Sequence, residues 1–288
     1  MKILSPVVLG LTFAVAGSMM TAAQDASSPF KVLQVVREDT KPYKGGAAHD
    51  KTESAFVTAM IKAKVPAHYI ALNSMSGKAR SLYLTLYDSF ADWEKANQMV
   101  EKNPALAAEL ERASTADGEL LEQVESTIYT SDSELSYKSR PDLTHARYLE
   151  MSVFHVRAGH REDFAKLAKL VKGAYDKAGT SGHWSMYDIA YGASDGTYMA
   201  LSADDSMADI DKAFSEDKKF QEALGSDGMK QYRELMMAAV DSSYSQLFSI
   251  NPKQSYPMDE WVKGNPDFWK PKAAAKPVAA KPDAAKKP

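Results

Sequence analysis

One carboxylate and two histidines are the side chains best placed for acid–base chemistry. Glu150 lies at the centre of a predicted strand, where burial would raise its pKa towards the range of a general base. His68 and His183 stand at matching positions at the start of two other predicted strands. Such a pair could line one pocket, act as acid and base, or bind a metal or haem iron. We therefore predict Glu150 and His183 as catalytic residues; the alternatives are a carboxylate in water and a histidine at a solvent-facing strand end.

The predicted strands carry alternating rows of aliphatic and of polar or aromatic side chains. Period two places Leu82, Leu84 and Leu86 on one strand face, and we expect that face to pack against helices. The other row would then line the space between two sheets, where tyrosines and a few polar groups suit a small, partly aromatic ligand. Plain core packing of the tyrosines is the alternative. The predicted ligand-binding residues are Gln34, His68, Tyr83, Tyr87, Tyr148, Tyr198 and Asp204.

An internal duplication positions these residues. Residues 82–96 match residues 199–213 without a gap, and His68-Tyr69 matches His183-Trp184 at nearly the same separation. The identical pairs are Leu84/Leu201, Asp88/Asp205, Ser89/Ser206, Ala91/Ala208, Asp92/Asp209, Lys95/Lys212 and Ala96/Ala213. The copies differ where chemistry is predicted, since Gln34 corresponds to Glu150 and Tyr87 to Asp204. A single working site is therefore expected nearer the second copy.

Each copy is predicted to run strand, helix, strand, strand, helix, strand. In the first copy Asp50 is the expected helix N-cap, with Glu53 as its capping-box partner, and the second helix is expected to break at Asn103-Pro104. In the first copy the predicted strands are 31–40, 68–75, 80–87 and 125–133. In the second copy a strand over 147–156 is followed by a helix over 160–178, by two strands around a turn at 194–196, and by a last strand from 242. This order is the split βαβ pattern of ferredoxin-like folds.

The element order and the duplication resemble the dimeric α/β-barrel superfamily, which includes cofactor-free antibiotic-biosynthesis-type monooxygenases, NIPSNAP-like proteins and haem-binding enzymes. The resemblance covers residues 30–256. It implies an α+β fold in which two ferredoxin-like βαββαβ repeats, 30–138 and 146–256, are fused into a pseudo-dimeric α/β barrel. Because one chain carries both units, a monomer would suffice to close the barrel. Residues 257–270 are expected to form a C-terminal strap around it.

The chain ends and the composition limit where the protein acts and what it binds. Residues 1–23 have the basic start, apolar stretch and small residues of a signal peptide, which predicts a secreted or periplasmic protein without a transmembrane segment after signal removal. Residues 271–288 form a Lys/Ala/Pro tail predicted to be disordered. The absence of cysteine excludes disulfides and thiolate chemistry. The formal net charge is −3 despite the basic tail, so the acidic body argues against nucleic acid as a partner.

The predicted function is binding of a small molecule between the two sheets of the barrel. The resemblance implies two alternatives, a cofactor-independent monooxygenase or isomerase and a haem-binding protein with His155 or His183 as the iron ligand. Neither a cofactor nor a metal site is predicted, because the chain has no GxSxG, HExxH, GxxxxGK(S/T) or calcium-loop pattern and no GxGxxG after a strand. His49 and His160 each precede the first helix of a copy, where a capping role is expected.

Overall fold

The two halves of the chain repeat one order of strands and helices. The structure, a computed structural model, describes residues 31–140 and 142–270; the predicted signal peptide 1–23 and the tail 271–288 lie outside the described residues. The first half runs β1 (Val32–Thr40), α1 (Ala47–Ala63), β2 (Tyr69–Ser74), β3 (Arg80–Tyr87), α2 (Phe90–Glu101), α3 (Pro104–Gly118) and β4 (Leu121–Tyr137). The second half runs β5 (Tyr148–Val156), α4 (Arg161–Ala178), β6 (Trp184–Tyr191), β7 (Thr197–Asp204), α5 (Met207–Ser215), α6 (Asp217–Ala239) and β8 (Val240–Ile250). Two short helices follow, α7 (Asp259–Gly264) and α8 (Pro266–Trp269).

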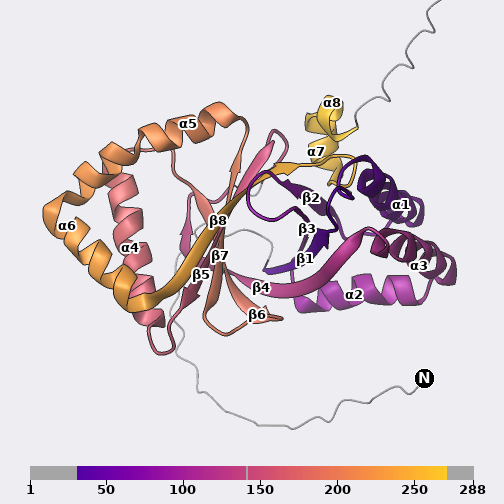
Figure 1. The fold of residues 1–288 in the computed structure, drawn as a ribbon, viewed down its shortest axis with the longest axis horizontal. Coiled ribbons are helices and arrows are strands. Elements are labelled where there is room, and N and C mark those ends of the chain that lie inside the picture. The colour runs from indigo at the N-terminus through magenta and orange to yellow at the C-terminus, as the bar shows by residue number, and fades with distance from the viewer. Residues whose placement is uncertain (1–30, 141, 271–288) are drawn as a thin grey trace, which may run out of the picture.

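The strands of both halves close into one barrel, in the order β1-β3-β2-β8-β5-β7-β6-β4. The halves join at two seams, where β4 pairs with β6 and β2 pairs with β8. Helices α1, α2 and α3 lie outside the strands of the first half, and α4, α5 and α6 outside those of the second (Figure 1). The predicted fold class, two ferredoxin-like repeats in a pseudo-dimeric α/β barrel, is confirmed.

The strand registers and the helix caps show the duplication residue by residue. Gln34 pairs with Thr85 across β1 and β3, as Glu150 pairs with Ser202 across β5 and β7. The helices after β3 and β7 start in the same way, because a serine hydroxyl accepts a hydrogen bond from the backbone N–H three residues on. These bonds run from Asp92 to Ser89 (3.1 Å) and from Asp209 to Ser206 (3.3 Å).

The first helix begins at Ala47, earlier than predicted, and this changes the setting of His49. Gly46 holds the N-cap position with a φ of 95°, which favours glycine, and no side chain caps the helix. Asp50 instead lies in the first turn and accepts a hydrogen bond from the Asn251 amide (2.8 Å). His49 is a buried residue inside the helix, so the predicted capping role for it is wrong.

Three further details differ from the expected elements. His160 does hold the N-cap position of α4, but its side chain makes no capping bond and its Nδ1 contacts the Asp163 carboxylate (3.0 Å). Strand β4 is longer than predicted, and α6 is kinked at Gly225, whose φ is 67°.

Within residues 31–140 and 142–270, no helix is long and apolar enough to cross a membrane.

The prediction of which strand face lies inside the barrel is wrong. The interior is filled by the aliphatic rows, with Leu82 and Leu84 of β3 packed among residues from the other seven strands. The polar and aromatic rows lie beneath the helices, where the Tyr198 ring packs on Phe164 of α4 with centroids 4.8 Å apart. Because strands shield the interior from water all round, the most apolar rows gain most there, although Tyr129 and Tyr187 also belong to this core. The predicted residues that face the helices are Gln34, Tyr83, Tyr87, Tyr148, Glu150, Tyr198 and Asp204.

The C-terminal segment closes one end of the barrel. Trp261 of α7 and Trp269 of α8 are buried, with their rings stacked 5.8 Å apart, and they join the barrel core together with Leu143. The cavity that remains at this end measures about 60 Å³ and has His68 and His183 in its lining. Ligand pockets usually measure about 300–1,000 Å³. This end of the barrel therefore has too little room for an aromatic ligand. A second cavity, of about 260 Å³, lies at the opposite mouth and has Leu82, Met151 and His155 in its lining, but none of the predicted ligand-binding residues lines it.

Candidate functional site

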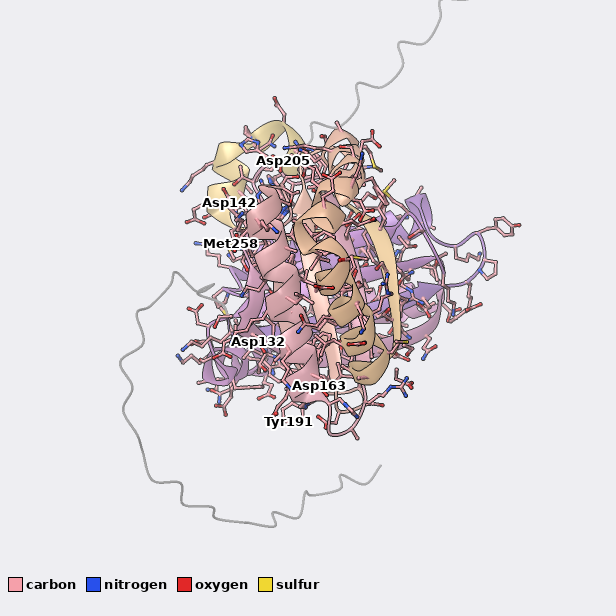
Figure 2. The ribbon with its side chains drawn as sticks, turned by 90° about the vertical axis from the view of Figure 1, so that its left-hand side faces the viewer. Asp132, Asp142, Asp163, Tyr191, Asp205 and Met258 are labelled. Atoms are coloured by element: carbon pink, nitrogen blue, oxygen red, sulfur yellow. The ribbon has the colours of Figure 1, made fainter. Side chains whose placement is uncertain are left out.

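The largest hollow lined by predicted residues lies between the strands of the second copy and the helices that cover them. Figure 2 shows α4 and α6 side by side in front of the strands, with Asp205 at the same end as Met258 of the C-terminal segment. A hollow of about 470 Å³ opens beneath α4 and α5, and one of about 260 Å³ opens beneath α4 and α6. They share Tyr175, Trp184 and Ser202 as walls, so we treat them as one feature, the helix–sheet cleft.

The larger hollow is polar and holds three of the predicted residues. Glu150, His183 and Asp204 all line it. Burial raises the pKa of Glu150, and the nearby Asp204 charge adds to the shift while His183 opposes it. Burial likewise raises the pKa of Asp204, again opposed by His183. Within the described residues neither carboxylate has a hydrogen-bond or ion-pair partner, so both are free to receive a donor from a ligand.

The His183 ring stands between the polar hollow and the barrel-end cavity. Its Nδ1 lies 3.1 Å from the backbone oxygen of Ser181 and its Nε2 lies 2.9 Å from that of Ala203. Both ring nitrogens therefore face acceptors, and neither lone pair points into the cleft. The Thr180 hydroxyl, which also lines the hollow, is buried without a hydrogen-bond partner in the described chain.

The smaller hollow is apolar and aromatic. Phe154, Phe164 and Met236 are among its walls. Tyr175 and Trp184, shared with the polar hollow, meet edge to face at a centroid distance of 5.5 Å. Such a cleft offers an aromatic ligand a flat, desolvated surface, next to carboxylates that would orient a polar group.

The structure brings together some of the predicted residues and separates the others. His68 and His183 line one cavity, as the paired positions suggested, but that cavity is the small one at the barrel end. Tyr198 is buried beneath α4, where its hydroxyl accepts a hydrogen bond from Arg161 (2.7 Å). Tyr148 is half-buried and does not line either hollow of the cleft.

The remaining predicted residues belong to the first copy. Gln34 and Tyr87 lie beneath the helices of that copy, with the Tyr87 hydroxyl 3.4 Å from the Gln34 amide oxygen. The Tyr87 ring packs against Trp93 of α2, at a centroid distance of 6.4 Å. These two side chains therefore pack as part of the first helix–sheet layer, away from Glu150.

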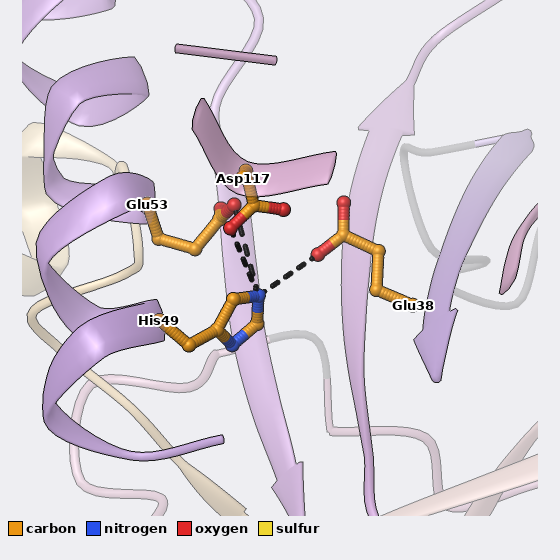
Figure 3. Close-up of side chains that lie close together, drawn as sticks. All are labelled: Glu38, His49, Glu53 and Asp117. Carbon is orange, nitrogen blue, oxygen red and sulfur yellow. Dashed lines mark hydrogen bonds and ion pairs between the residues drawn. The ribbon is translucent and has the colours of Figure 1, made fainter. Parts of the chain in front are cut away.

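A buried polar cluster in the first copy was not predicted. It consists of Glu38 on β1, His49 and Glu53 one turn apart on α1, and Asp117 in the last turn of α3 (Figure 3). The His49 Nε2 lies 3.2 Å from a Glu38 oxygen, 3.4 Å from Asp117 and 3.9 Å from Glu53. His49, Glu53 and Asp117 are each no more than 3% exposed.

The charges in this cluster shift the pKa values of its members. Burial alone would lower the pKa of His49, but contacts with Asp117 and Glu38 outweigh it and raise the pKa to about 10. Burial, with the charges of Glu38 and Asp117, raises the pKa of Glu53 to about 8. In the sequence, the four-residue spacing of His49 and Glu53 is the signal that could indicate this cluster, because it places both side chains on one face of a helix. A helix that starts at Asp50, as expected, leaves His49 outside it.

Comparison with solved structures agrees with the barrel fold. A provisionally assigned monooxygenase from Fusobacterium nucleatum subsp. nucleatum ATCC 25586 is 11% identical, with a TM-score of 0.51 over 77% of this chain and 92% of that chain. A haem-binding protein from Thermus thermophilus is 11% identical, with a TM-score of 0.45 over 78% and 92% of the two chains. A mutant chlorite dismutase from Candidatus Nitrospira defluvii is 8% identical, with a TM-score of 0.47 over 81% and 95%.

These likenesses concern the fold alone. No protein-family model matches the sequence, and no curated protein matches it. At 11% identity the Fusobacterium nucleatum structure, whose TM-score is above 0.5, agrees with the barrel fold alone, and the chemistry of this chain has to be argued from its own residues.

Proposed function

We propose that this protein binds a small molecule with an aromatic body and a cationic or hydrogen-bond-donating group in the helix–sheet cleft of its second copy. The observation that carries the proposal is the pair of unpartnered carboxylates, Glu150 and Asp204, beside an aromatic wall. The sequence predicts such a ligand between the two sheets; the cleft lies on the other face of the same strands, where Glu150 and Asp204 are found.

The polarity of the cleft favours a donor group on the ligand. The two cationic side chains that line it are already engaged, Lys138 near Asp176 (3.7 Å) and Arg140 with Asp205 (3.2 Å). Glu150 and Asp204 retain free acceptor oxygens, and the Thr180 hydroxyl lacks a partner among the described residues. An ammonium or hydroxyl group would supply the missing donors, whereas a ligand carboxylate would add a further acidic group to a hollow that Glu150, Asp204 and Asp209 already line.

A matched pair of ligands tests this polarity. Tyramine and 4-hydroxyphenylacetate share a phenol ring but carry an ammonium and a carboxylate respectively. We expect tyramine to bind and to raise the melting temperature as its concentration exceeds its Kd, with 4-hydroxyphenylacetate having no effect. Calorimetry should show about a tenfold weaker Kd for tyramine in Glu150→Gln, which copies the residue that Gln34 supplies in the first copy.

The control is Glu162→Gln, which removes an exposed carboxylate from the first turn of α4. It should bind tyramine as the wild type does. Preference for the carboxylate ligand, equal affinities in Glu150→Gln and the wild type, or no binding of either ligand would each contradict the proposed site.

Glu150 also favours a second candidate function. Its raised pKa and its place in the cleft would let it remove a proton from a phenol or quinol, as a cofactor-independent monooxygenase or isomerase requires. Oxygen uptake measured across a panel of phenols and quinols, with Glu150→Gln as the comparison, distinguishes turnover from binding. Consumption that depends on Glu150 would make the protein an enzyme.

Haem binding fits this cleft poorly. His183 is the only histidine lining the two hollows within the described chain, and both of its nitrogens face backbone oxygens. Binding of haem iron by His183 would require one of these nitrogens to give up its contact. His155, the other proposed ligand, lines a different cavity at the opposite mouth of the barrel.

Export by the segment 1–23 stays part of the proposal, and detection of a mature chain shortened at about that position would support it.

A further inference from the structure

The buried cluster of the first copy has the composition and arrangement of a metal site. We propose that Glu38, His49, Glu53 and Asp117 bind one divalent first-row transition-metal ion per chain. The site is separate from the helix–sheet cleft and does not depend on the function proposed for it. Its ligands come from a strand and two helices, so a bound ion would tie β1, α1 and α3 together.

The geometry is close to that of a coordinated ion. One candidate ligand atom from each residue lies within 4.8 Å of all the others. Ligands about 2.1 Å from a tetrahedral ion lie about 3.4 Å from one another, and trans ligands of an octahedral ion lie about 4.2 Å apart. The His49 Nε2 distances of 3.2, 3.4 and 3.9 Å to three carboxylates span the same range. Small rotations of the side chains would complete the site.

Hydrogen bonding alone leaves this cluster incomplete. A single nitrogen, the His49 Nε2, faces three carboxylate oxygens, yet it carries at most one hydrogen to donate. Glu53 is only 3% exposed, and its Oε1 is buried without a hydrogen-bond partner in the described chain. The Tyr83 hydroxyl is the neighbour able to donate to Glu53 and its contact with that carboxylate affects the pKa of both groups, but the two atoms do not reach the geometry of a formed hydrogen bond. An ion at the centre would displace the Nε2 proton and bind the freed lone pair together with the Glu53 oxygen.

The second copy shows that the fold does not need these polar groups. Strand register places Phe154 where the first copy has Glu38, because Glu38 pairs with Ser81 as Phe154 pairs with Tyr198. By the same register Ala200 stands in the place of Tyr83. The second copy thus has apolar side chains at these two positions of the equivalent layer. Three carboxylates and an imidazole in the first copy therefore call for a chemical reason, which a bound cation supplies.

Neighbouring side chains hold the ligands in place. The Thr52 hydroxyl donates a hydrogen bond to Asp117 Oδ1 (2.5 Å), the carboxylate oxygen that faces His49. Such outer contacts orient metal ligands and are a regular part of metal sites. His49 and Glu53 are fixed by their spacing of one helical turn, which puts both side chains on the face of α1 that meets β1.

The donor set selects the class of ion. One imidazole nitrogen with three carboxylates suits manganese, iron or zinc, whereas magnesium and calcium prefer oxygen ligands alone. We therefore expect Mn²⁺ and Zn²⁺ to bind and Mg²⁺ to compete weakly.

The test uses untagged protein stripped with a chelator and dialysed against Mn²⁺ or Zn²⁺. We expect one ion per chain by elemental analysis, and a Kd at least about tenfold higher in Glu53→Gln, which keeps the side-chain shape but removes a ligand charge. Two variants serve as controls. Glu111→Gln alters an exposed carboxylate on α3, and His160→Gln alters the histidine at the start of the equivalent helix.

A spectroscopic readout keeps the proposal testable even if a variant folds poorly. Pulsed electron paramagnetic resonance of the Mn²⁺-loaded wild type should detect coupling to a single imidazole nitrogen, and circular dichroism checks the fold of Glu53→Gln. Binding of less than one ion per chain, equal Kd values in Glu53→Gln and Glu111→Gln, or a Mn²⁺ spectrum without nitrogen coupling would each overturn the assignment.

Discussion

Glu53 should make the metal-free protein lose stability as the pH rises, and Glu53→Gln should remove that loss. The pKa of Glu53 is about 8 in the folded chain and starts from 4.5 without the surrounding structure. A carboxyl whose pKa is raised by folding contributes stability that is fully present below the lower value. That stability is lost as the pH rises through the higher one. The window therefore runs from about pH 4.5 to 8, the reverse of an ordinary salt-bridged carboxylate.

The size of the effect follows from the two pKa values. Between pH 5 and pH 7 the linkage relation gives a loss of about 2–3 kcal/mol in the free energy of unfolding from Glu53 alone. The amide side chain in Glu53→Gln cannot titrate, so the variant should lose about that much less than the wild type over the same interval. His49, whose pKa is raised to about 10, contributes a further loss of the same sign from about pH 6.5 to 10 in both proteins.

Urea unfolding followed by tryptophan fluorescence, with a chelator present, measures this difference. Glu111→Gln is the matched control, since Glu111 is exposed on the same helix as Asp117 and should leave the pH profile of the wild type unchanged. The reasoning fails if wild type and Glu53→Gln have parallel profiles from pH 5 to 7. It fails equally if the wild type becomes more stable relative to Glu53→Gln as the pH rises.

Other substitutions test the cleft, the core and the caps. Gly182→Ala would place a Cβ 2.2 Å from the Tyr175 ring, so we expect it to push that ring into the cleft. Calorimetry should then show weaker binding of tyramine. Gly173→Ala is the control, because open space surrounds Gly173, and it should leave tyramine binding unchanged. Phe248→Ala, at a fully buried barrel position, should lower the free energy of unfolding by about 3–5 kcal/mol in urea titrations; a loss below about 1 kcal/mol would contradict the packed interior. Ser89→Ala and Ser206→Ala should each cost about 1 kcal/mol, and their effects should add in the double variant because the caps are independent.

The duplication made the architecture predictable. Matching segments define two copies, and turn and capping residues divide each copy into strands and helices, so the order of elements follows. The closed barrel was implied by the resemblance of that order to dimeric α/β-barrel proteins. Ser89 and Ser206 illustrate this, since their local hydrogen bonds depend only on residues three positions away. Strand pairing follows the same symmetry, with the register of Gln34 and Thr85 repeated at Glu150 and Ser202.

The side to which each strand face turns could not be read from alternation. Leu82 and Tyr83 belong to rows that are both buried, one in the barrel and the other beneath the helices. Period two separates the rows without saying which is inside, and sheets covered on both faces have no water-facing row to decide the matter.

The polar cluster was missed for another reason. Asp117 joins His49 only through the packing of α3 on α1, which no local pattern encodes.

Fusion of the two copies explains how their interiors could diverge. In a true homodimer every substitution appears twice, so a charge introduced beneath the helices of one subunit enters the other as well. Within one chain the positions vary independently: the first copy has Glu38 where the second has Phe154, and the second has Glu150 where the first has Gln34. Glu38 and Gln34 are four residues apart on β1, about 13 Å along the strand. The two copies therefore keep their charged groups at different depths of the same layer. That displacement permits two sites of different chemistry in one barrel, a compact polar cluster in the first copy and an open aromatic cleft in the second.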